Sequence, residues 1–336
     1  MNKIFIILSV SLLLLLGACT KEISNNDSFT VYTSNALNDT AWLKIIQIND
    51  PIFALADSIF KVDILKDSID FEKDYTFSFG DSLEVEVKGN SLVTGTGLFL
   101  NGKAKIEIIR LQRKGDFIKV FRPNSSYGTL LETAGGFFIR ISKNGTELFL
   151  APGKTINIKY LDIEAPKPIM QAYYGYETTP LPLSILDTAN NWIPNGDTNR
   201  LKPWSQTNGS IVKKGYILES KKLRFISAAY PLQNSKPTTN IYAILPPNFT
   251  NKNTLVFAVF ENNRTVLNMP SDYTARSFKV DYIPIGSKIR LVSISKVGSD
   301  YYLGTKSVNG VGTSVNYSFT PQKKKLAQIL EYLNSL

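Results

Sequence analysis

The side chains that could do chemistry in this chain are few. Its 336 residues contain no histidine and a single cysteine, Cys19. Without histidine there is no Ser–His–Asp triad, no HExxH zinc motif and no His switch near neutral pH. A hydrolase would therefore need paired carboxylates or a Ser–Lys arrangement. The acidic candidates occupy the loop-rich middle of the chain, and their spacing requires no pairing, so we expect no catalytic activity: Glu177, Asp187, Asp197 and Glu219.

Metal, cofactor and nucleic-acid sites are not indicated either. Residues 190–199 (NNWIPNGDTN) offer oxygen ligands but lack the alternating acidic spacing of a calcium loop, so a plain loop is favoured. The glycines at 95–97 and 309–312 read as turns, because neither leads from a strand into a helix with the phosphate-loop pattern. No clustered arginine and aromatic motif supports nucleic acid as a partner. We expect no metal and no cofactor.

Cys19 directly follows an apolar N-terminal run. Lys3 supplies a positive charge, and residues 4–16 are almost wholly apolar, which suits a signal peptide and is shorter than the roughly 20 residues of a membrane-spanning helix. Residues 16–19 (LGAC) match the bacterial lipobox, whose cysteine thiol takes a diacylglyceryl group. An ordinary secretory signal with a chance cysteine is the alternative. The motif predicts cleavage after residue 18 and a lipid anchor on Cys19.

The residue after Cys19 indicates which membrane would hold the anchor. It is Thr20 and not the aspartate that signals inner-membrane retention, so we expect the outer membrane. Two or more acyl chains anchor a protein stably. Whether the protein faces the cell surface or the periplasm stays open.

Charge is distributed unevenly along the chain. Residues 20–100 carry 6 Lys and Arg against 13 Asp and Glu, whereas residues 101–336 carry 31 against 15. A basic body beyond an acidic segment could meet anionic glycans or envelope proteins. The simpler interpretation is a lysine-rich surface that keeps the protein soluble.

Aromatic residues are concentrated in the proline-rich middle of the chain. Exposed aromatic side chains in loops stack on sugar rings or anchor protein partners. The favoured alternative is that they fill a small core between sandwiches. The candidate ligand-binding residues are Tyr173, Tyr174, Tyr176, Trp192 and Trp204.

Two-residue alternation of apolar and polar side chains predicts that strands position these groups. Residues 82–88 (SLEVEVK) and 103–111 (KAKIEIIRL) show it clearly. Residues 135–153 read as a hairpin, because Asn144-Gly145 suits a tight turn. Lys114-Gly115-Asp116 reads as a simple turn between two strands. Short strands recur from about residue 238 at the spacing of a sandwich or barrel.

The chain ends differently. Thr320 could cap a helix with Pro321 at its first position, and apolar residues follow at helical spacing. We therefore predict an all-β protein with two to three tandem β-sandwich domains and a short C-terminal α-helix. The expected segments are a signal peptide (1–18), a tether (19–57), a β-sandwich (58–165), a loop-rich β middle domain (166–236), an immunoglobulin-like or carboxypeptidase-regulatory-like β-sandwich (237–320) and the helix (321–336).

Three stretches resemble a group of uncharacterised Bacteroidota surface lipoproteins. Residues 93–153, with their KGD loop, GGFFI strand and NGTEL hairpin, look like an ankyrin-type upper β-sandwich. Residues 245–295 resemble a carboxypeptidase-regulatory-like or immunoglobulin-like strand pattern, and the closing AQILEYLNSL is the third stretch. The chain departs from the group at residues 225–229 (FISAA). The resemblance implies a surface lipoprotein and carries over no activity.

This resemblance makes one modification motif relevant. Bacteroidota-type O-glycosylation uses Asp, then Ser or Thr, then a small or aliphatic residue, a short motif that often matches by chance. The motif predicts glycosylation at some of Thr40, Ser58, Ser68, Ser82 and Thr188.

Together these features indicate a lipid-anchored, non-catalytic module of the cell envelope with a structural, adhesive or protein-interaction role. The alternative is a glycan-binding surface lipoprotein that serves polysaccharide uptake. The expected partners are the membrane, through the lipid anchor, and envelope proteins or anionic glycans.

Overall fold

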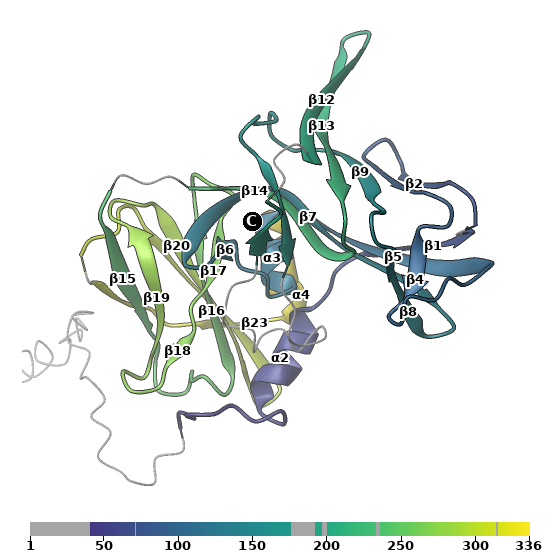
Figure 1. Cartoon of the computed structure of the whole chain (residues 1–336). Coiled ribbons are helices and arrows are strands. Elements are labelled where there is room, and N and C mark those ends of the chain that lie inside the picture. Colours follow the sequence, from purple (N-terminus) through teal and green to yellow (C-terminus); the bar gives the residue numbers. More distant parts are fainter. Residues whose placement is uncertain (1–40, 71, 176–191, 197–199, 233–235, 314) are drawn as a thin grey trace, which may run out of the picture. The chain divides into compact units, whose positions relative to one another are not determined.

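The computed structural model describes residues 41–70, 72–175, 192–196, 200–232, 236–313 and 315–336. These residues form four largely antiparallel sheets and end in a short helix (Figure 1), which confirms the predicted all-β class and the C-terminal helix. Cys19 and the predicted signal peptide lie outside the described residues.

The first sandwich packs a nine-stranded sheet, sheet I, on a five-stranded sheet, sheet II, around one apolar core. Sheet I consists of β1 (Ile64–Asp70), β5 (Lys103–Leu111), β7 (Thr129–Lys143), β14 (Arg224–Pro231), β10 (Gln171–Gly175) and β11 (Trp192–Pro194), with β4 (Leu92–Thr94), β6 (Ser125–Ser126) and β8 (Thr146–Leu150) attached. Sheet II consists of β12 (Leu201–Asn208), β13 (Ile211–Ser220), β9 (Ile156–Leu161), β3 (Leu83–Val87) and β2 (Tyr75–Phe79).

The segment expected as a separate middle domain, residues 166–236, supplies strands to both of these sheets. β10, β11 and β14 join sheet I, and β12 and β13 extend sheet II beyond β9. Pro203 lies in β12, an edge strand, where the missing N–H of proline is tolerated. The prolines that suggested linkers are therefore compatible with strands.

Local sequence determines the turn at residues 144–145 as predicted. β7 and β8 pair across it, and Asn144 and Gly145 both take positive φ, at 49° and 79°. Asn and Gly tolerate this conformation, which matches the twist of the two strands.

The second sandwich packs sheets III and IV around a core of its own. Sheet III consists of β18 (Ser271–Asp272), β19 (Ser277–Pro284), β15 (Thr238–Ile244) and β22 (Val315–Ser318). Sheet IV consists of β17 (Val266–Asn268), β16 (Thr254–Phe260), β20 (Ile289–Val297), β21 (Asp300–Val308) and β23 (Gln322–Lys324).

Sheet IV is apolar on both faces because helices cover its outer side. β16 turns Val256 and Ala258 into the sandwich core and Phe257 and Val259 toward helix α2 (Pro51–Ile59) and helix α4 (Leu326–Ser335). Burial on both faces explains why residues 254–260 (TLVFAVF) read as a continuous apolar run.

The two helices correct the sequence interpretation at both ends of this region. α2 occupies part of the predicted tether and is buried along one face. α4 begins at Leu326 and not at Pro321, because residues 322–324 pair with β21 as β23. The apolar spacing in the C-terminal segment is confirmed, since Ile329 and Leu333 are fully buried.

A third helix joins the two sandwiches. α3 (Lys114–Lys119) replaces the simple turn expected at Lys114-Gly115-Asp116. Phe117 and Val120 pack on the outer face of sheet I, whereas Ile118 and Phe121 pack on the outer face of sheet IV. The helix and the turn after it therefore contribute to both apolar clusters.

Candidate functional site

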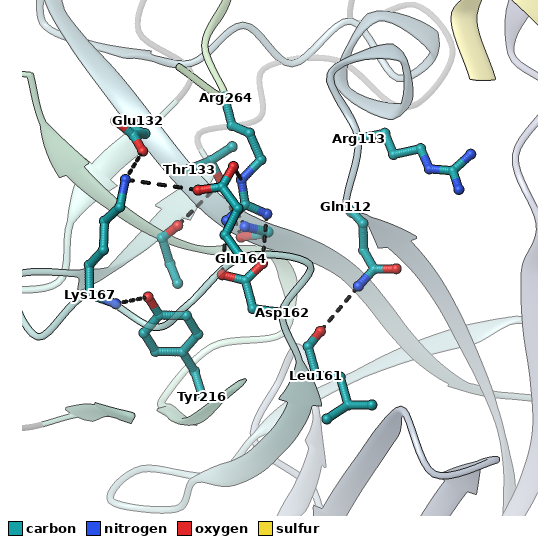
Figure 2. A network of polar contacts seen from close by, with 12 residues as sticks. Gln112, Arg113, Glu132, Thr133, Leu161, Asp162, Glu164, Lys167, Tyr216 and Arg264 are labelled. Carbon is teal, nitrogen blue, oxygen red and sulfur yellow. Dashed lines mark hydrogen bonds and ion pairs between the residues drawn. The ribbon is translucent and has the colours of Figure 1, made fainter. Parts of the chain in front are cut away.

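A buried network of charged side chains lies where the two sandwiches meet (Figure 2). Arg264, in the turn between β16 and β17, donates hydrogen bonds of 2.7 and 2.8 Å to the two carboxylate oxygens of Asp162. The Arg264 and Asp162 side chains are 6% and 2% exposed. Arg264 Nε also lies 3.3 Å from Glu164. Each sandwich thus contributes one partner of a two-pronged, desolvated ion pair.

Glu132 of β7 is the second carboxylate of this network. It accepts hydrogen bonds from Lys167 Nζ, from Tyr230 Oη at 2.7 Å and from Asn263 Nδ2 at 2.7 Å. Burial raises the pKa of Glu132, but the hydrogen bonds from Lys167, Tyr230 and Asn263 outweigh it, so its pKa lies below the ordinary value. A general acid needs the opposite shift. Glu132 therefore acts as a fixed anion that joins the sandwiches.

Hydrogen bonds to backbone atoms reinforce the same junction. Thr133 N donates to Arg264 O at 3.1 Å, and Thr265 Oγ1 donates to Leu131 O at 2.8 Å. Asn124 Oδ1 accepts from Val266 N at 2.8 Å. The network is therefore structural.

We expect Glu132→Gln to flatten the dependence of stability on pH. The folded-state pKa of Glu132 lies below the ordinary value of 4.5. The ionised form therefore stabilises the fold above about pH 4.5, and this contribution disappears as the pH falls through the lower folded-state pKa. Between about pH 5 and pH 3 the melting temperature of the wild type should fall more steeply than that of the variant. Parallel melting curves would contradict this assignment.

Of the four carboxylates considered for catalysis, Glu219 is described. It forms an ion pair of 2.5 Å with Arg200 on the outer face of sheet II. Glu177, Asp187 and Asp197 lie outside the described residues.

Three of the five predicted ligand-binding aromatics lie in the core. Tyr173, Tyr174 and Trp192 are buried in strands of sheet I, and Trp192 Nε1 donates to Pro123 O at 2.9 Å. The Trp192 ring meets Phe225 edge-to-face, with centroids 6.3 Å apart. These aromatic side chains are buried because both faces of sheet I are covered. Trp204 is half-buried on the outer face of sheet II, and Tyr176 lies outside the described residues.

The predicted modification sites differ in accessibility. Ser68 is exposed on the edge strand β1. The Ser58 hydroxyl forms hydrogen bonds with Ala54 O and Tyr301 Oη. The Ser82 hydroxyl forms hydrogen bonds with Phe79 O and Arg110, so both hydroxyls already have hydrogen-bond partners within the protein. Cys19, Thr40 and Thr188 lie outside the described residues.

A pocket of about 610 Å³ opens beside sheets III and IV. Its lining is mainly apolar and includes Leu130, Leu267, Met269 and Phe278. This volume and lining are typical of sites that bind a small molecule or the side chain of a partner.

Strained backbone shapes the wall of this pocket. Phe121 and Tyr282 line it with backbone φ angles of 54° and 62°, values that residues other than glycine rarely adopt. Tyr282 is 61% exposed, and its ring lies close to Gly128. Such conformations cost of order 1–3 kcal/mol each and gather at ligand-binding sites.

One residue around the pocket has a buried polar atom without a partner among the described residues. Asn268 Oδ1 is buried and accepts no hydrogen bond from any described residue. Buried acceptors almost always accept a hydrogen bond in folded proteins, so we expect a donor from a ligand or an ordered water to bond to this oxygen. An apolar lining, strained aromatic residues and one unsatisfied acceptor make this pocket the best candidate binding site.

No local motif marks this site, because its residues are far apart in the chain. They extend from Ile46 to Tyr282, and the fold alone brings them together.

No known family model matches the sequence, and a search of curated proteins finds no significant match. Among the described residues, no helix has both the length and the apolar character needed to cross a membrane.

Proposed function

We propose that this protein is a lipid-anchored, non-catalytic interaction module of the outer membrane. Acyl chains on Cys19 would hold it at the bilayer, as the LGAC motif predicts. The resemblance to Bacteroidota surface lipoproteins supports the same assignment. The inter-sandwich ion pairs support a rigid, structural role for the body of the protein.

The observation that carries the proposal is the 610 Å³ pocket with Tyr282 at its wall. Protein interfaces derive most of their energy from a few side chains that insert into pockets, and tyrosine is enriched there. An apolar side chain of an envelope protein would fill the pocket. The role is therefore adhesion or assembly at the envelope.

Photo-cross-linking in cells tests this function. A benzophenone amino acid in place of Tyr282 should give one discrete adduct with an envelope protein. The same group in place of Phe149, an exposed residue of the other sandwich, should give none. Ser271→Trp, which places a large ring at the pocket wall, should abolish the adduct. Equal adducts from both positions, or none from position 282, would reject the pocket as the interaction site.

The anchor is checked in the same cells. Cys19→Ser should release the protein from the membrane fraction and prevent palmitate incorporation. A serine variant that stays membrane-bound would reject lipid anchoring while leaving the pocket result intact.

A second candidate function is the binding of a glycan for polysaccharide uptake. It is favoured by the outer face of sheet II, where Lys159 of a groove lined by polar side chains lies 4.8 Å from the centre of the Trp204 ring.

A further inference from the structure

The outer face of sheet II carries polar side chains in register across its strands. One rung crosses the sheet from β2 to β13, with a pair of Cα partners at each step: Thr76, Glu86, Asn157 and Glu219. The next rung runs from β2 to β12: Ser78, Glu84, Lys159, Ile217 and Lys202. The opposite face of these strands lies in the sandwich core. The alternation of the strands therefore fixes a grid of donors and acceptors.

Contacts within this grid hold the side chains in place. Asn157 Nδ2 donates to Glu86 at 3.1 Å, and Lys159 Nζ lies 3.2 Å from Glu84. Arg200, just before β12, pairs with Glu219 at 2.5 Å. These contacts order the side chains before any ligand arrives, which reduces the entropy lost on binding.

Charges on this face cancel. The groove of about 520 Å³ is lined by three acidic side chains and three basic ones: Glu84, Glu86, Glu219, Lys159, Arg200 and Lys202. An anionic polymer gains no net attraction from such a surface, although the chain as a whole is basic. Ile217 is the apolar side chain in the lining, so the groove also lacks the apolar centre of a protein interface.

Trp204 belongs to the next rung of this face, beyond the groove. Gly215 lies between Trp204 and Leu161 in the sheet register, and Trp204 Nε1 reaches Tyr160 O at 3.3 Å. Lys159 Nζ lies 4.8 Å from the centre of the indole ring. The indole is therefore held near the groove and half-exposed, where the C–H groups of a sugar ring can pack against it.

We propose that the outer face of sheet II binds an uncharged polysaccharide whose chain crosses the strands. Paired carboxylates, amides and ammonium groups match the hydroxyls of sugars, which both donate and accept hydrogen bonds. Neighbouring strands lie about 4.8 Å apart, close to the length of one hexose in a chain, so successive sugars meet successive strands. This inference rests on the second candidate function and names its ligand class.

The test is retention of the detergent-solubilised full-length protein on immobilised polysaccharides. Starch, xylan and laminarin serve as uncharged probes, and alginate and heparin as anionic ones. The wild type should bind at least one uncharged polymer. Trp204→Ala and Glu86→Gln should each weaken that binding at least tenfold at an unchanged melting temperature. Tyr273→Ala, an exposed tyrosine of the other sandwich, should bind as the wild type does.

Three outcomes would overturn the inference: no retention on any uncharged polymer, retention on the anionic polymers alone, or equal binding by the wild type and both groove variants. The cross-linking result at position 282 is independent of the groove. Loss of glycan binding with that adduct intact therefore overturns this inference alone, and loss of the adduct with glycan binding intact overturns only the pocket.

Discussion

Gly115→Ala is expected to lower the free energy of unfolding by at least about 3 kcal/mol, at or beyond the upper end of overpacking costs. A Cβ at Gly115 would overlap the backbone carbonyl of Leu333, so helices α3 and α4 could not keep their separation. The Leu333 carbonyl belongs to the backbone and is not the end of a flexible side chain, so it cannot easily move aside. Because residues 117–121 pack on both sandwiches, a shift of α3 would disturb both apolar clusters.

Denaturant unfolding measures this effect, and Gly310→Ala is the matched control. Nothing lies within 4 Å of a Cβ at Gly310, and its backbone is not in the left-handed region. The control should change stability by no more than about 0.5 kcal/mol. A Gly115→Ala protein as stable as the control would show that α3 and α4 are not in close contact.

Asp162→Ala is expected to destabilise the protein by about 3–5 kcal/mol. The substitution would leave the Arg264 guanidinium desolvated, with Glu164 as its remaining ion-pair partner. Burial lowers the pKa of Arg264, but Asp162 outweighs it, so the pKa stays above the ordinary value in the wild type. Loss of Asp162 removes that compensation.

A double-mutant cycle separates this ion pair from its surroundings. Asp162→Leu combined with Arg264→Met should recover most of the lost stability, because apolar residues of similar volume often replace a buried pair at little cost. Urea unfolding of the single and double variants provides the coupling energy. Single variants within about 1 kcal/mol of the wild type would indicate that water reaches the pair.

The strands were the most predictable part of this fold. Residues 103–111 alternate in the sequence and form β5 over the same span, and Asn144-Gly145 makes the turn it predicts. Both features depend on neighbours in the chain, so local physical chemistry is sufficient. The partners of each strand are not local, which is why residues 166–236 looked like a separate domain.

The helices show where sequence patterns were overlooked or overridden. α2 carries Ile52, Leu55, Ala56 and Ile59 at helical spacing behind Pro51, a signal that the expectation of a tether obscured. In contrast, the helix start predicted at Thr320-Pro321 does not form, because β23 pairs with β21 where the helix was expected to begin.

The candidate site could be predicted only in part. Trp204 was singled out for its residue type; it lies half-buried on the outer face of sheet II, and its role in ligand binding stays a prediction. Trp192 has the same residue type but is buried in the core. The sequence of a single strand does not show whether the face that carries a side chain is covered or open, so the two tryptophans could not be distinguished. The pocket depends on residues brought together by sheets I, III and IV, helix α2 and the loop after α3, so no short motif encodes it.

The course of the chain has a mechanical consequence. Before it builds the first sandwich, the polypeptide is fastened to the second: Leu43 exchanges hydrogen bonds with Asn251, Ile52 N donates to Lys252 O, and α2 packs under sheet IV. Tension applied from the amino-terminal side would enter the carboxy-terminal sandwich directly and bypass the other one. Sheets I and II would remain unloaded, so the outer face of sheet II would keep its shape while the protein is pulled.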